Sequence, residues 1–85
     1  MKLLKCNKCG DIFNIKLNVK SCSCGESSGC YDDNLNAHYS GDCLPLGITN
    51  NSFKIAEVLQ PDDGDGKEFT AFVIPKNCET FKKIK

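Results

Sequence analysis

Two short cysteine turns constrain this chain more than any other feature of its sequence. The turns read Cys6-Asn-Lys-Cys9-Gly10 and Cys22-Ser-Cys24-Gly25, and twelve residues separate Cys9 from Cys22. A tight turn of this kind presents two sulfur atoms to one ion, and a Gly after the second cysteine suits a backbone with positive φ. Zn²⁺ prefers four soft ligands at the corners of a tetrahedron. The spacing therefore predicts one Zn²⁺ ion per chain, held by Cys6, Cys9, Cys22 and Cys24.

The second cysteine pair is one residue shorter than the usual Cys-x2-Cys. This departure leaves Cys30 as an alternative ligand in place of Cys22 or Cys24. Iron in the same four-thiolate site is the alternative metal. Four protein ligands leave no open coordination position, so we expect a structural ion. Its binding free energy, on the order of 10 kcal/mol in small zinc modules, would supplement the small core of a short chain.

The chain has 85 residues and seven cysteines. This length predicts a single domain over residues 1–85, in which 1–25 form a zinc ribbon and 26–85 contribute a sheet, a loop and a helix. An odd number of cysteines does not suit a complete disulfide framework. No apolar run is long enough for a signal peptide or a membrane span. We therefore expect a protein of the reducing cytoplasm, where clustered cysteines serve as metal ligands.

The hydrophobic pattern predicts a small α+β fold, with the N-terminal zinc ribbon joined to an antiparallel sheet and one short helix. Apolar and polar residues alternate from Phe13 to Val19, which indicates a half-buried strand across residues 11–20. Residues 30–35 read as a short strand ending in a turn. Gly, Pro and Asn are frequent across residues 36–51, which we expect to form an ordered loop.

The C-terminal half contains the expected helix. Ser52 can cap a helix over residues 53–60, which Pro61 ends. Residues 61–66 read as a turn. The run 68–75 is apolar on both faces, so we expect a strand that is central or covered on both sides. In the tail, 77–85, Phe81 and Ile84 have helical spacing.

The formal net charge is zero, and its distribution is uneven. Residues 1–25 carry five Lys and one Asp, residues 26–66 carry one Lys and eight acids, and residues 67–85 carry five Lys and two acids. The chain has no Arg, the side chain best suited to bidentate contacts with phosphate and guanine. Nucleic-acid binding through the ribbon, as in transcription-associated zinc ribbons, therefore stays the alternative function and not the first.

The segment 39–53 is the candidate ligand-binding site. Its glycines and the start of the helix leave backbone N–H groups available to an anion, and its polar side chains could contact a base or a ribose. We expect a small anionic or nucleotide-like ligand there. A homo-oligomer is a further alternative for the assembled protein, because a short chain forms a deep pocket more easily between two copies. The candidate ligand-binding residues are Tyr39, Gly41, Gly47, Thr49, Asn50, Asn51 and Ser52.

Catalysis has one candidate pair. His38 is the only histidine, and Cys30, Cys43 and Cys78 lie outside the predicted metal site, so an enzyme using Cys43 and His38 is conceivable. Small buried cysteines usually act as packing residues, and no catalytic motif stands out. We therefore expect no enzyme activity.

The cysteine turns, followed by Gly41-Asp-Cys-Leu-Pro-Leu-Gly-Ile-Thr-Asn50, resemble small uncharacterised zinc-ribbon proteins of bacteria and phages. The resemblance covers roughly residues 5–53, and its distinctive part is Pro45-Leu-Gly-Ile48. No established activity accompanies it. It implies a phage-type context, in which small proteins block a host protein or sequester a nucleotide-derived immune signal in the host cytoplasm.

Overall fold

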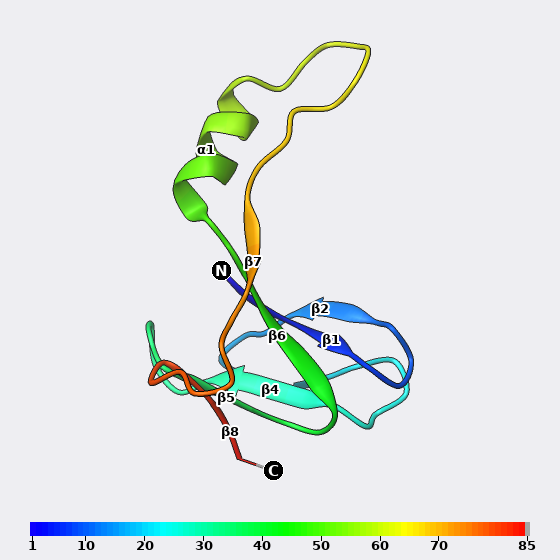
Figure 1. The fold of residues 1–85 in the computed structure, drawn as a ribbon, viewed down its shortest axis with the longest axis vertical. Coiled ribbons are helices and arrows are strands. Elements are labelled where there is room, and N and C mark those ends of the chain that lie inside the picture. The colour runs from blue at the N-terminus through cyan, green and yellow to red at the C-terminus, as the bar shows by residue number, and fades with distance from the viewer. Residues whose placement is uncertain (85) are drawn as a thin grey trace.

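Two four-stranded sheets and one short helix form the fold of residues 1–84, the part of the chain that this computed structural model describes (Figure 1). The small α+β fold predicted from the sequence is therefore confirmed. Lys85, the last residue of the predicted tail, lies outside the described residues. The elements in chain order are β1 (Lys2–Cys6), β2 (Ile12–Asn14), β3 (Lys20–Ser21), β4 (Ser28–Tyr31), β5 (Ala37–Ser40), β6 (Cys43–Ile48), α1 (Asn50–Val58), β7 (Ala71–Val73) and β8 (Phe81–Lys83).

The first sheet has the order β2-β1-β6-β7 and is antiparallel throughout. Strand β1 is central, so Leu4 pairs with Phe13 on one side and Pro45 on the other. At the end of the same strand, Cys6 pairs with Cys43. The end of β1 thus carries the first metal-site cysteine and is fixed by pairing with β6.

The second sheet has the order β3-β4-β5-β8, in which only the β5–β8 pair is parallel. Residues 36–51, predicted as a loop, instead contain strands β5 and β6. Gly41 has φ +97° in the turn between them, and this turn leads the chain from the second sheet into the first. Gly41 lies in this turn, Pro45 and Gly47 lie within β6, and Asn50 and Asn51 begin the helix α1 (Asn50–Val58).

The core lies between the two sheets and contains residues from both. The ring of Phe81 packs edge-to-face on that of Tyr39, with centroids 4.8 Å apart. The predicted helical tail is therefore wrong, because Phe81 is a fully buried strand residue that pairs with Ala37. The buried cluster consists of Leu4, Cys6, Phe13, Ile15, Cys22, Ala37, Tyr39, Ile74 and Phe81.

The alternation across residues 11–20 holds only in its first half. Phe13 and Ile15 are buried, whereas Leu17 and Val19 are 67% and 69% exposed. Strand β2 ends at Asn14, and the chain then crosses to the second sheet, so the later residues have no partner layer to cover them. A periodic pattern predicts a strand but not the point at which its sheet ends.

Helix α1, residues 59–70 and β7 form an arm that extends from the rest of the fold, and β7 is at the same time the edge strand of the first sheet (Figure 1). The helix begins at Asn50, earlier than predicted, and its N-cap residue is Thr49. Ser52 does not cap it: its hydroxyl donates to the Thr49 carbonyl and accepts from the Thr70 N–H, at 2.9 Å each. The prediction of a central strand over 68–75 is also wrong, because β7 is a short edge strand whose three residues are exposed.

Within residues 1–84, no helix is long and apolar enough to cross a membrane.

Candidate metal centre

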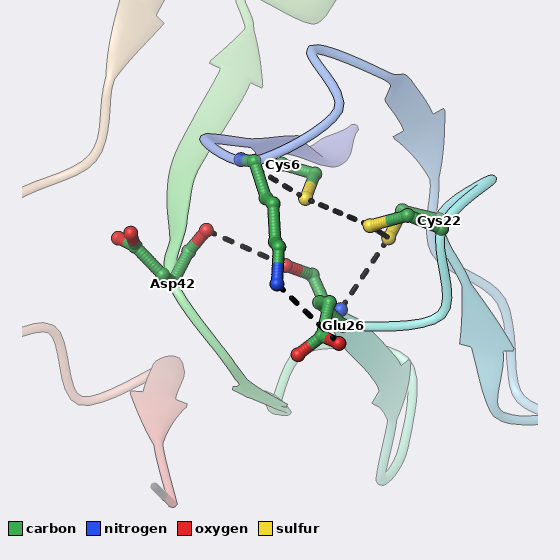
Figure 2. A network of polar contacts seen from close by, with 7 residues as sticks. Cys6, Cys22, Glu26 and Asp42 are labelled. Carbon is green, nitrogen blue, oxygen red and sulfur yellow. Dashed lines mark hydrogen bonds and ion pairs between the residues drawn. The ribbon is translucent and has the colours of Figure 1, made fainter.

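The sulfur atoms of Cys6, Cys9, Cys22 and Cys24 all lie within 4.8 Å of one another. The Cys6–Cys24 and Cys22–Cys24 sulfur distances are 3.7 and 3.4 Å. A tetrahedral ion with Zn–S bonds of about 2.3 Å requires sulfur–sulfur distances of about 3.8 Å. Figure 2 shows the side chains of Cys6 and Cys22 directed toward the same point. This group could therefore hold a metal ion such as Zn²⁺.

Both cysteine turns end in a Gly with positive φ. Gly10 and Gly25 have φ values of +78° and +80°, as the sequence predicted. The Gly10 N–H donates to the Cys6 carbonyl at 2.8 Å, and the Gly25 N–H donates to the Cys22 carbonyl at 3.1 Å. Closing each turn in this way brings the second sulfur of the pair back toward the first.

The two cysteine pairs come from different sheets. Cys6 and Cys9 lie at the turn between β1 and β2 of the first sheet, whereas Cys22 and Cys24 lie at the turn between β3 and β4 of the second. Cys6 and Cys22 are buried in the core cluster, and Cys9 and Cys24 are exposed. An ion bound here would link the two sheets at one end of the core.

Backbone and hydroxyl donors surround the buried sulfurs. The Lys8 N–H lies 3.4 Å from the Cys6 sulfur, and the Ser27 N–H lies 3.4 Å from the Cys22 sulfur. A side-chain hydrogen bond with Ser27, followed by backbone N–H donors, lowers the pKa of Cys6 to about 6. Such donors favour the thiolate, which is the form that binds a metal.

The pKa of Cys24 is shifted in the opposite direction from that of Cys6, because it is raised. The Glu26 N–H favours its thiolate, but local desolvation and hydrogen bonding among the neighbouring cysteines raise the pKa of Cys24 to about 12. Four thiolates this close together repel one another, so the last of them ionises only with difficulty. A divalent cation at the centre of the group would remove that penalty, and this is the charge that Zn²⁺ supplies.

Polar side chains hold the two turns in place. Ser23 donates from both its N–H and its hydroxyl to Asp11 Oδ2, at 3.0 Å each. The Asn7 amide donates to Asp42 Oδ1 at 3.0 Å, which ties the first cysteine turn to the turn between β5 and β6. The hydroxyl of Ser27 donates to the Asp42 carbonyl at 3.4 Å (Figure 2). These contacts fix the sulfur positions without using the cysteines themselves.

The other cysteines lie outside this group. Cys30 contacts the His38 ring instead, so the geometry favours the set Cys6, Cys9, Cys22 and Cys24 over its alternatives. Cys43 is directed at the carbonyls of the turn at Ser40 and Gly41, not at His38. The thiol beside His38 is thus Cys30 and not Cys43. Hairpin pairing of β4 with β5 brings the two residues together, and this register was not evident from the sequence.

The predicted ligand-binding residues are dispersed. Gly47, Thr49 and Asn50 share an open depression of about 420 Å³ beside Phe72. Tyr39 is buried in the core, and Gly41 lies in the turn at the far end of β6, so neither lies with them. Asn51 is exposed on the helix, and Ser52 bridges Thr49 to Thr70.

Comparison of the chain with protein-family models, curated proteins and solved structures finds no match in any of the three. The four-cysteine cluster is consistent with a zinc-ribbon-like site, and no family match adds to it. The metal group and the surfaces that the fold exposes are therefore the features that bear on function.

Proposed function

We propose that this chain is a non-enzymatic binding protein, built around one structural Zn²⁺ ion, that captures a partner protein through its arm. The arm is defined as α1, residues 59–70 and β7. The proposal follows chiefly from the apolar side chains that the arm exposes. Blocking of a host protein is the biological role that this chemistry would serve.

The zinc would be structural because its coordination would be complete. Four thiolates occupy all the corners of a tetrahedron and leave no position for water or substrate. The ion would instead join the turn carrying Cys6 to the turn carrying Cys22, and so hold the two sheets together.

The chain exposes more surface than a compact protein of its mass. A folded monomer of 9.3 kDa is expected to expose about 5,000 Å², whereas this chain exposes 5968 Å². Its radius of gyration is 14.1 Å, against about 12 Å for a compact domain of this length. The excess is similar to the roughly 800 Å² that each partner buries in a standard interface. An extended arm is the part of this fold that could supply such an interface.

The exposed apolar residues concentrate on the arm. Val58 is 82% exposed, and strand β7 presents an unpaired edge to which a second strand could add. Monomeric proteins seldom leave such a set uncovered. The exposed large apolar residues of the arm are Ile55, Val58, Leu59, Phe69, Phe72 and Val73.

A groove on the arm indicates what kind of partner would fit. Its apolar floor includes Phe53 and Phe69, whose rings meet edge-to-face with centroids 5.0 Å apart. Acidic residues predominate around it, with Lys67 as the one cation among the lining residues. The acids are Glu57, Asp62, Asp63 and Asp65. Charge complementarity therefore favours a protein segment with an apolar centre flanked by Lys or Arg.

Nuclear magnetic resonance titration of the zinc-loaded protein tests this proposal. A short peptide with an apolar centre and Lys flanks should shift amide signals on the arm, and a matched peptide with Glu flanks should not. Phe69→Ser should weaken binding about tenfold, because it removes one of the two aromatic rings of the groove floor. Leu17→Ser, which removes an exposed apolar side chain outside the arm, is the control. Equal binding of both peptides, or unchanged binding affinity in Phe69→Ser, would contradict the proposal.

A small anionic ligand is the second candidate. The depression that contains Gly47, Thr49 and Asn50 also contains Lys2, and none of the described residues that line it is acidic. The N-terminal end of α1 opens beside it, where a helix dipole favours negative charge. The same titration with a nucleoside monophosphate would shift Thr49 and Asn50 signals if this depression is the site, and would leave the arm unchanged.

A further inference from the structure

Three side chains on β4, β5 and the turn between them form a second chain of contacts. The Asp32 carboxylate lies 2.7 Å from His38 Nδ1, and His38 Nε2 lies 3.5 Å from the sulfur of Cys30. Cys30 and His38 are direct register partners, so their side chains share one face of the sheet. Ala37 and Tyr39 on either side of His38 are buried, which places His38 on the face opposite the core.

We propose that Cys30 and His38 form a second site for a transition-metal ion, with Asp32 positioning the imidazole. A tetrahedral ion with a Zn–S bond of about 2.3 Å and a Zn–N bond of about 2.0–2.1 Å separates the two donor atoms by about 3.6 Å. The observed separation is 3.5 Å. Both donors could therefore reach one ion with little rearrangement of either strand.

The carboxylate gives the imidazole the required tautomer. A carboxylate accepts hydrogen bonds, so Asp32 places the ring proton on Nδ1 and leaves the lone pair of Nε2 facing the Cys30 sulfur. Metal-binding histidines commonly have such a carboxylate behind them. A thiolate and an imidazole are ligands for Zn²⁺, Co²⁺ or Ni²⁺ and not for Mg²⁺ or Ca²⁺.

The site opens to solvent on the histidine side. Cys30 is only 7% exposed, but the His38 side chain is 31% exposed and lines an open depression of about 560 Å³. Asp32 and Glu79 line the same depression and favour a cation, whereas Lys82 opposes it. With two protein donors, water would occupy the remaining positions. This site should therefore bind more weakly than the four-cysteine group and fill after it.

The proposal is tested by titrating metal-free protein with Co²⁺ under reducing conditions, so that the protein refolds as it binds the metal. Absorption bands report the ligands of each bound ion, and native mass spectrometry counts the ions. We expect two equivalents to bind in order, the first with the spectrum of four thiolates and the second with that of mixed sulfur and nitrogen ligands. His38→Ala should lose the second equivalent and keep the first. Asp32→Asn should weaken the second about 10- to 100-fold. Cys43→Ser, whose thiol belongs to neither group, should bind two equivalents like the parent protein.

The first equivalent serves as an internal measure of correct folding in every variant. Saturation of the parent protein at one equivalent would overturn the proposal and leave Cys30 and His38 as a hydrogen-bonded pair. Retention of the second equivalent in His38→Ala would overturn it as well. Mg²⁺ added in place of Co²⁺ should produce no second binding event.

Discussion

Replacement of Cys9 by Ser tests the structural role of the metal in isolation. Cys9 is exposed, so the change removes a metal ligand without opening a cavity in the core. Cys6 and Cys22 would not serve as well, because both belong to the buried cluster and their replacement also disturbs packing. Any large loss of stability in Cys9→Ser therefore reports the loss of metal coordination.

The expected loss is large because the core is thin. The chain exposes 5968 Å², so folding buries about 56% of the roughly 13,500 Å² of an extended chain of this mass, where a compact domain would bury more than 60%. Structural Zn²⁺ contributes about 10–16 kcal/mol in small modules, against a net stability of about 5–15 kcal/mol for typical domains. Cys9→Ser should thus lower the free energy of unfolding by more than about 5 kcal/mol, which corresponds to a fall in Tm of more than about 20 °C.

Thermal unfolding followed by circular dichroism measures this change, and inductively coupled plasma mass spectrometry gives the zinc content. Cys78→Ser is the matched control, since Cys78 is a partly exposed cysteine outside the metal group, and its Tm should stay within a few degrees of the parent. Strong chelation of the parent protein should reproduce the Cys9→Ser result. A chelated protein that retains a cooperative transition near the original Tm would refute this reasoning.

Two further pairs of variants test local parts of the fold. Gly41→Ala should lower the unfolding free energy by about 3 kcal/mol or more, because φ is +97° and the added methyl would overlap the Glu26 carbonyl. Gly64→Ala, at φ +80° with nothing within 4 Å of the added methyl, should lower it by only about 1–2 kcal/mol. A similar Tm for both variants would show that the turn at Gly41 can move. Ser52→Ala should lower the unfolding free energy by about 0.5–1.5 kcal/mol, because the Thr70 N–H loses its protein acceptor. Asn51→Ala should lower it by less than half of that amount, and calorimetry showing equal losses for the two variants would exclude the bridging role of Ser52.

The metal group was predictable because its information is local. Each cysteine pair closes its own turn, and Gly10 and Gly25 supply the backbone form that the turns need. The α+β class follows similarly from short apolar segments and one segment of helical spacing that Pro61 ends. The order of the strands is not local: β8 pairs with β5 across more than forty residues, and nothing near Phe81 specifies that partner.

The apolar run 68–75 shows where hydrophobicity misleads. An apolar strand usually lies in a core, yet β7 lies at a sheet edge with Phe72 and Val73 exposed. Pattern alone does not distinguish a strand buried within its own chain from a strand that is buried only when a partner binds. The contact of Cys30 with His38 was not predictable from the sequence for a related reason. It depends on the register of the β4–β5 hairpin, and part of that hairpin lies in a segment predicted as a loop.

Strand β6 connects the metal group to the arm, and this has a consequence for how binding would depend on zinc. One end of β6 begins at Cys43, which pairs with the metal-site residue Cys6, and the other end pairs Gly47 with Lys2 on one side and with Phe72 of the arm on the other. The arm joins the rest of the fold at β6, whose end leads into α1 and whose edge pairs with β7. An ion that fixes the end of β1 therefore also fixes the strand from which the arm extends. Partner binding should require zinc even though no residue of the arm contacts it, because loss of the ion would release β1 and β6 together.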